Sequence, residues 1–145
     1  MRAVLQRVAQ ARVDVDGRVV GEIGRGWLVL LGIGRGDDEA RADQLAEKVA
    51  LLRCFEDADG KTNLSILDVG GQVLLVSQFT LYADLSRGRR PGFTLAAAPQ
   101  EAAALVDYFG ERLRQHGLTV EQGQFGAHMQ VSLVNDGPFT IWLEA

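Results

Sequence analysis

Cysteine is nearly absent from this sequence. Its one cysteine, Cys54, has no second cysteine for a disulfide, and a cysteine-ligated metal site is not indicated. Cys54 follows Leu51 and Leu52 and precedes Phe55 by one position, so its surroundings in the chain are apolar. A free cysteine in such a stretch is more often a small buried side chain than a nucleophile. We therefore expect Cys54 to belong to the core.

Long apolar runs are also missing. No stretch approaches the roughly 18 apolar residues that a membrane-spanning helix needs. The chain opens with an alternating segment, residues 1–8, that carries Arg2 and Arg7. This pattern is typical of a β-strand and differs from the continuous apolar stretch of a secretory signal. We expect a cytoplasmic protein.

The residue types of the commonest catalytic sites are scarce. Only two histidines occur, His116 and His128, and they lie too far apart in sequence to indicate a metal site. His116 falls at the end of a predicted helix, where a cation interacts favourably with the helix dipole. No nucleophile elbow, zinc-protease motif or phosphate-binding loop is found, and the glycines of 32–36 are interpreted as a turn. The sequence predicts neither a metal nor a cofactor.

The charge balance excludes a strongly basic surface. With 15 Lys and Arg against 19 Asp and Glu, the net charge is −4, so any contact with RNA would be local. Three arginines nevertheless fall together at Arg87, Arg89 and Arg90. Because the guanidinium fork binds phosphate in a bidentate manner, this cluster is a candidate phosphate-binding site. The alternatives are a solvated surface loop and ion pairs that hold the loop or a subunit contact.

The rest of the composition is that of one ordered domain. Hydrophobic residues make up 47% of the chain, and 145 residues suffice for one core rather than two. We expect a single domain, residues 1–145, of the α/β class, with mixed and largely antiparallel β-sheets and two helices. The expected strands, of which the first four form a meander, are 1–10, 11–16, 18–23, 27–33, 73–76, 118–121, 129–134 and 139–144.

Turn and cap residues mark the limits of these elements. Asp16-Gly17 predicts a hairpin turn with positive φ. Asp37-Asp38 offers an N-cap for a first helix that runs to about Phe55. Pro99 opens a second helix, which Gly117 ends. The uninterrupted apolar run of 73–76 predicts a strand that is buried on both faces.

Two polar segments adjoin apolar strands, where binding and catalytic residues are often held on rigid support. The first, residues 77–81, reads Ser-Gln-Phe-Thr-Leu and directly follows the predicted buried strand. The second, residues 135–140, reads Asn-Asp-Gly-Pro-Phe-Thr. On spacing alone the second segment predicts a tight hairpin turn between the last two strands.

These two segments resemble the signature motifs of the D-aminoacyl-tRNA deacylases, and the resemblance extends from end to end of the chain. Three positions depart from the usual family pattern, namely Gly92, His128 and Phe139. The further segments that are similar to the family, in the same order, are Met1-Arg-Ala-Val-Leu-Gln-Arg-Val8, Gly60-Lys-Thr-Asn-Leu-Ser65, Asp68-Val-Gly-Gly71, Tyr82-Ala-Asp84, Arg89-Arg-Pro91 and Phe125-Gly-Ala-His-Met129.

The resemblance implies an enzyme that hydrolyses the ester between a D-amino acid and the 3′-terminal ribose of tRNA. It also implies a deacylase-type fold and a homodimer with sites at the subunit interface. A Gly-cis-Pro element, here Gly137-Pro138, would enter the partner's site and reject L-aminoacyl esters, whereas the sequence alone would predict a trans bond. The implied catalytic residues are Gln78, Phe79 and Thr80, and the implied substrate contacts are Ser77, Phe125, Ala127, Met129 and Asn135.

The family also implies cleavage of glycyl-tRNA(Ala), because contacts that act through the backbone cannot exclude an achiral amino acid. The role of Thr80 has two interpretations. A hydroxyl nucleophile needs a base, and the sequence offers no evident Ser-His-Asp set. We favour hydrolysis by a positioned water assisted by the ribose 2′-OH, with backbone N–H groups near Phe79 and Thr80 as oxyanion donors.

A second class of function stays open on the sequence. The chain could be an RNA-binding module, or an accessory protein of DNA unwinding, that uses Arg87, Arg89 and Arg90 on phosphates. The two signature motifs favour the enzyme, because a protein that only binds has no need of them.

Overall fold

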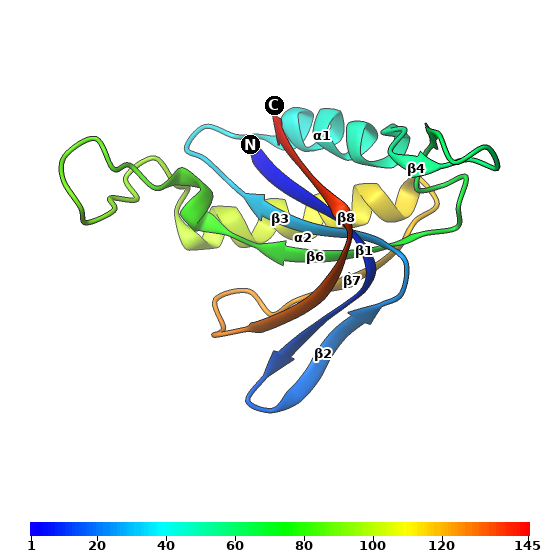
Figure 1. The fold of residues 1–145 in the computed structure, drawn as a ribbon. Helices are drawn as coiled ribbons and strands as arrows, with labels where there is room; N and C mark the ends of the chain where they lie inside the picture. Colours follow the sequence, from blue (N-terminus) through cyan, green and yellow to red (C-terminus); the bar gives the residue numbers. More distant parts are fainter.

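The sheet is assembled on the long strand β1 (Arg2–Val15) in the computed structural model, which describes residues 1–145. The first half of β1 pairs with β3 (Gly26–Gly32), and its second half pairs with β2 (Arg18–Ile23). Along its other edge it pairs with β8 (Gln130–Glu144) over nearly its whole length. All three pairings are antiparallel, so β1 is the centre of the antiparallel part of the fold (Figure 1).

The other part of the sheet is parallel. Strand β3 pairs with β6 (Gln72–Ser77), which in turn pairs with β7 (Thr119–Gln122). The chain crosses from β3 to β6 through α1 (Glu39–Leu51) and from β6 to β7 through α2 (Pro99–Gln115). Parallel neighbours require such crossovers, whose helices cover the sheet. The mixed architecture with two helices confirms the predicted fold class.

Two apolar clusters lie on opposite faces of the sheet. Both helices pack on one face, where the larger cluster includes Trp27, Phe55 and Phe109. Side chains alternate along a strand, so neighbouring residues of β3 and β6 enter the second cluster on the opposite face. That face is covered by β2, which approaches β7 so closely that a Cβ on Gly21 would lie 2.8 Å from the backbone oxygen of Gln122.

The ends of the helices follow the predicted cap residues. Asp38 is the N-cap of α1, and its side chain accepts a hydrogen bond from the Arg41 amide at 3.0 Å. Helix α2 begins at Pro99, and Gly117 follows it with φ +94°. The first helix ends at Leu51 rather than near Phe55, because Phe55 enters a small hairpin of β4 (Phe55–Glu56) and β5 (Thr62–Leu64). Neither helix has the length and apolar character needed to cross a membrane.

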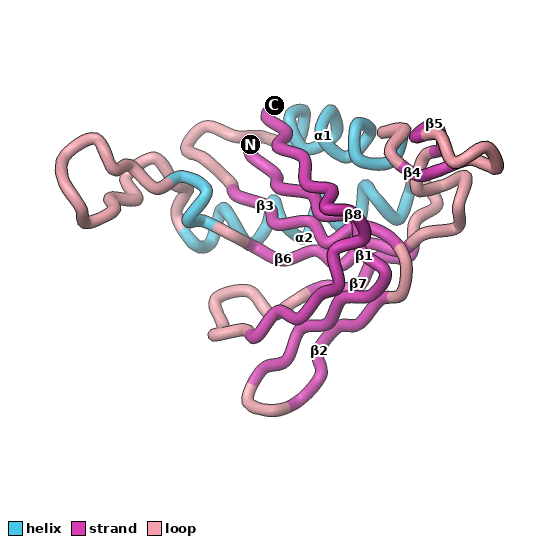
Figure 2. The backbone as a smooth tube through the Cα atoms, in the orientation of Figure 1, coloured by secondary structure: helices cyan, strands magenta, loops and turns pink.

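Two details of the strand prediction are wrong. The predicted strands 1–10 and 11–16 are one strand, β1, and both β2 and β3 pair with β1 rather than with each other, so the opening strands are not a meander (Figure 2). Residues 129–134 and 139–144 belong to the single strand β8, so Asn135–Thr140 does not reverse the chain. The pairing of β8 with β1 shifts register at this point, and the segment is a bulge within the strand.

Other local predictions are confirmed. Asp16 and Gly17 have φ of 50° and 75° at the β1–β2 turn. All of residues 73–76 are buried, as expected for a strand covered on both faces. Cys54 is 7% exposed, and burial raises the pKa of its thiol, so it is a core residue with little thiolate character.

Candidate active site

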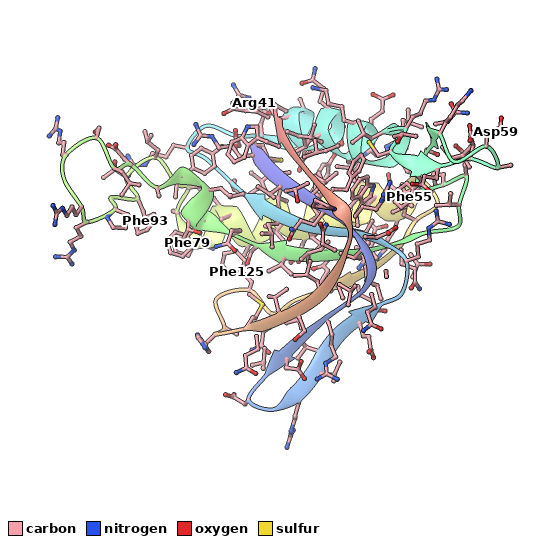
Figure 3. All side chains as sticks on the ribbon, viewed as in Figure 1. Arg41, Phe55, Asp59, Phe79, Phe93 and Phe125 are labelled. Carbon is pink, nitrogen blue, oxygen red and sulfur yellow. The ribbon has the colours of Figure 1, made fainter.

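A pocket of about 370 Å³ opens where the parallel strands end. Its walls are predominantly apolar, and Phe79, Phe93 and Phe125 lie near one another beside it (Figure 3). Phe79 is 57% exposed and meets Phe93 edge-to-face at 4.9 Å between ring centroids. The pocket is lined by Leu31, Ile33, Ser77, Gln78, Phe79, Phe93, Ala96, Ala97, Pro99, Ala102, Val106, Phe125 and Gly126.

The first signature segment forms one wall of this pocket. Strand β6 ends at Ser77, and the Gln78 amide donates to the Leu31 carbonyl of β3 at 2.7 Å. The chain then tightens into the short 3-10 helix η1 (Phe79–Tyr82). Because the first N–H groups of a helix have no partner within it, the amides that open η1 can serve as donors to a ligand. The segment thus brings the side chains of Ser77, Gln78 and Phe79 to the pocket, whereas Thr80 lies outside its lining.

The surroundings of Thr80 decide what its hydroxyl can do. The side-chain amide of Gln78 donates to Thr80 Oγ1, and this is the one side-chain hydrogen bond of Thr80. An amide is not a base and cannot accept a proton from the hydroxyl. Neither histidine lines the pocket. One chain therefore lacks the base that a threonine nucleophile would need.

The other end of η1 is fixed by Tyr82. Its ring packs so closely on β3's end that a Cβ on Gly34 would lie 2.6 Å from the Tyr82 hydroxyl oxygen. The hydroxyl lies 3.4 Å from an Asp37 carboxylate oxygen. Burial, followed by the charge of Asp37, raises the pKa of Tyr82 to about 12, so the phenol stays protonated near neutral pH.

The second signature segment is held by its own asparagine. The Asn135 side-chain amide donates to the carbonyls of Arg7 and Phe139, each at 3.0 Å, and its oxygen accepts from the Phe139 amide at 3.0 Å. These bonds close the bulge across Asp136, Gly137 and Pro138, which remain exposed. The Gly137-Pro138 bond is cis. Asn135 uses its polar atoms on the backbone, so it shapes the segment.

Arg7 supports the bulge from beneath. Its residue is 7% exposed, and its guanidinium donates to the carbonyls of Asp136 at 2.9 Å and Cys54 at 2.7 Å. The same group lies 4.4 Å from the Phe139 ring centroid. Buried charged groups are tolerated only when they are well hydrogen-bonded, and these contacts meet that condition. No pattern in the sequence predicts this role for Arg7.

The two signature segments do not meet within one chain. The pocket takes Ser77, Gln78, Phe79 and Phe125 from the predicted site, whereas no residue of 135–140 lines it. Ala127 and Met129 are also outside the lining, and Met129 packs on the second core cluster. The exposed Gly137-Pro138 bulge is therefore free to contact another molecule.

The sequence did not reveal most of the pocket walls. Ala96, Ala97, Ala102 and Val106 come from the start of α2 and the segment before it. Small apolar residues on a helix are typical of ordinary packing, so their pattern carries no sign of a site. The strand topology does indicate where the pocket lies, because clefts in α/β sheets form beyond the carboxyl ends of parallel strands.

The predicted arginine cluster lies on a projecting hairpin loop (Figure 1). Its base is closed by two hydrogen bonds between the backbones of Asp84 and Gly92, at 2.8 and 2.9 Å. Hydrogen bonds from Ser86 hold the pKa of Asp84 below its ordinary value. The side chains of the three arginines, Arg87, Arg89 and Arg90, are exposed and form no ion pair within the chain.

The sequence is similar to proteins of known family along its whole length. A family model described as D-Tyr-tRNA(Tyr) deacylase matches residues 4–144. The D-aminoacyl-tRNA deacylases of Thermomicrobium roseum and Symbiobacterium thermophilum are 61% and 62% identical over 145 residues, which is all of this chain and 94% and 96% of theirs. That of Escherichia coli O81 is 56% identical over 144 residues, or 99% of each chain.

Solved structures agree on the fold. One described as c-Myc DNA Unwinding Element Binding Protein has a TM-score of 0.94 and 42% identity, covering 100% of this chain and 99% of its own. Another, described as a probable eukaryotic D-amino acid tRNA deacylase, has a TM-score of 0.82 and 21% identity, covering 98% and 97%. The family resemblance noted in the sequence is thus confirmed, and the chain belongs to the D-Tyr-tRNA(Tyr) deacylase family, a family of hydrolases.

Proposed function

We propose that this enzyme hydrolyses D-aminoacyl-tRNA to the free D-amino acid and tRNA, as a homodimer in which each pocket is completed by the partner copy. The observation that carries the proposal is the separation of the two signature segments. One borders an open apolar pocket, whereas the other is an exposed bulge away from it. A two-fold symmetric dimer would bring the bulge of each copy to the pocket of the other.

Selection of the D configuration calls for a rigid surface. An apolar pocket discriminates by only about 1–3 kcal/mol per methylene, so it distinguishes enantiomers poorly. The backbone of Gly137 and Pro138 is held by the hydrogen bonds of Asn135 and Arg7. Its carbonyls would hold the substrate's α-amino group and leave no room for an L side chain. Because these carbonyls would contact the groups on the α-carbon and not the side chain, the enzyme would accept D-amino acids with many different side chains.

The ester supplies much of the reactivity itself. We assign the attack on the ester carbonyl carbon to a water molecule. The bond from this carbon to the ribose 3′ oxygen breaks, and that oxygen takes up a proton with help from the neighbouring 2′-OH. Backbone N–H groups at Phe79 and Thr80 would stabilise the oxyanion, and Gln78 would orient the segment. The absence of a base near Thr80 supports this route over an acyl-enzyme.

The arginine hairpin would receive the tRNA. Phosphate contacts position a nucleic acid without reading its sequence, and a protein of net charge −4 needs a local positive surface for them. Arg87, Arg89 and Arg90 are exposed and unpaired within the chain, so they are available to phosphates. Such an enzyme would act in the cytoplasm, in proofreading of translation.

The proposed function is tested by incubating the protein with D-Tyr-tRNA, L-Tyr-tRNA, D-Asp-tRNA and glycyl-tRNA(Ala) and following ester loss. We expect both D esters and the glycyl ester to be cleaved and the L ester to persist, because selection acts at the α-carbon. Cleavage of D-Tyr-tRNA but not D-Asp-tRNA would refute selection that ignores the side chain. Binding of tRNA without any ester loss would favour an RNA-binding module.

Thr80→Val, which keeps the shape of the side chain and removes its hydroxyl, tests the chemical route. Loss of one oxyanion-hole donor costs about 10² to 10³ in rate, and the backbone donors remain in this variant. We expect kcat to stay above about a thousandth of wild type, with no burst of an acyl-enzyme in rapid-quench measurements. A larger loss, with Thr80→Ser active, would show instead that the hydroxyl is the nucleophile.

Replacing Arg87, Arg89 and Arg90 together by alanine tests the hairpin. We expect KM to rise for every tRNA, and the slope of log KM against log salt to fall by about 1 for each lost phosphate contact. The preference for D esters should not change. The matched control replaces the same residues by lysine, which keeps the charge. An unchanged salt slope in a folded alanine variant would exclude the tRNA role.

A further inference from the structure

Arg2 contacts several elements at once. Its Nε atom donates to Glu144 of β8 at 2.9 Å, and its Nη1 atom donates to the Leu81 carbonyl of η1 at 3.0 Å. The guanidinium carbon lies 4.4 Å from the Tyr82 ring centroid and 5.8 Å from that of Trp142. Arg2 does not line the pocket. Its contacts nevertheless join the first and last strands of the chain to η1, which contains the last three residues of the first signature segment.

The carbonyl of Leu81 lies near the C-terminal end of η1, where carbonyls accept no hydrogen bond from within the helix. The last carbonyls of a helix have no partner within it, and in a helix of four residues they are a large share of the total. The internal bonds of η1 are few, among them Leu81 N to Gln78 O at 3.2 Å and Ala83 N to Thr80 O at 3.0 Å. Such a short helix depends on outside contacts to hold its position.

The outside contacts of η1 gather at its last residue, Tyr82. Gly34 and Asp37 meet Tyr82 on one side, and the Arg2 guanidinium stacks on the ring. Arg2 adds the hydrogen bond to Leu81 that the tyrosine cannot provide. The other end of η1 is exposed at Phe79 and Thr80, the residues that face substrate under the proposed function. The bond from Gln78 to Leu31 holds the start of η1, and the contacts of Arg2 help to hold its end, so the alignment of Phe79 and Thr80 depends on both.

We propose that Arg2 is a positioning residue for ester hydrolysis, which fixes η1 so that the backbone at Phe79 and Thr80 is aligned with the substrate carbonyl. The inference rests on the proposed function and adds a residue outside the pocket to it. The Arg2 side chain is 30% exposed and that of Glu144 is 56% exposed. Ion pairs this exposed contribute little to stability, so the main consequence of Arg2 lies in alignment.

The inference predicts a selective loss of kcat. Misplacement of reacting groups by about 1 Å can cost about 10² in rate, so we expect Arg2→Met to lower kcat by about 10 to 100-fold. The KM for tRNA should stay within about twofold of wild type, since the arginine hairpin is untouched. Arg2→Lys, which can make one of the two hydrogen bonds but lacks the planar fork, should fall between.

The matched control is Arg12→Met. Arg12 lies on the same strand, pairs with Asp14 at 2.8 Å and is remote from η1, so this variant should retain wild-type kcat. Full kcat in Arg2→Met, or an equal loss in Arg12→Met, would overturn the inference. A raised KM with unchanged kcat would do the same, because it would make Arg2 a tRNA contact.

Hydrogen exchange gives a readout that does not depend on activity. In Arg2→Met the amides of Leu81 and Ala83 should exchange faster, while those of β1, β3 and β6 keep wild-type protection. Unchanged exchange in η1 would overturn the positioning role. If the wild-type protein fails to cleave D-Tyr-tRNA, the proposed function fails, and the exchange data still decide whether Arg2 fixes η1.

Discussion

The pairing of β1 with β8, and its interruption at Asn135–Phe139, is the constraint on which the rest of the site depends. If β1 and β8 were hydrogen-bonded without interruption, β8 would be an ordinary edge strand with no projecting segment. Instead the Asn135 side chain replaces ladder bonds with its own, and the buried Arg7 guanidinium binds the Asp136 carbonyl. The exposed Gly137-Pro138 peptide is therefore carried on the sheet rather than on a loose loop. Rigid support of this kind is what discrimination by backbone contacts needs.

The same sheet also positions the first signature segment, which lies at the ends of its parallel strands. The parallel strands β3 and β6 deliver the chain to η1, while α2 and the loop before it supply the apolar wall. Under the proposed function, the backbone of Gly137 and Pro138 would select the D configuration, the pocket would admit the aminoacylated end of the tRNA, and the arginine hairpin would bind phosphates. This separation is consistent with a site built by two copies, since one chain has both parts but does not join them.

Local chemistry in the sequence was sufficient to predict the helices, the buried strand 73–76 and the Asp16-Gly17 turn, because caps, periodicity and positive φ are encoded nearby. It failed at residues 135–140, where Asn, Asp, Gly and Pro are also the residues of a hairpin turn. Only the long-range bonds to Arg7 distinguish a bulge from a turn. For the same reason the pocket walls at Ala96 and Ala102 could not be predicted, since they become neighbours of Ser77 only in the fold. The position of the two signature segments beside apolar strands indicated a possible site, and the family resemblance implied its activity.

Mixing two defective variants tests most directly whether the site is shared between subunits. Ala96→Trp would block the pocket, and Gly137→Ala would distort the bulge, because the added Cβ would lie 2.1 Å from the Phe139 amide nitrogen. Each variant alone should fail to cleave D-Tyr-tRNA. After subunit exchange at equal concentrations, shared sites predict about one quarter of wild-type activity, since half of the dimers are mixed and each has one intact site. No recovery in a mixture shown to contain mixed dimers would contradict the account.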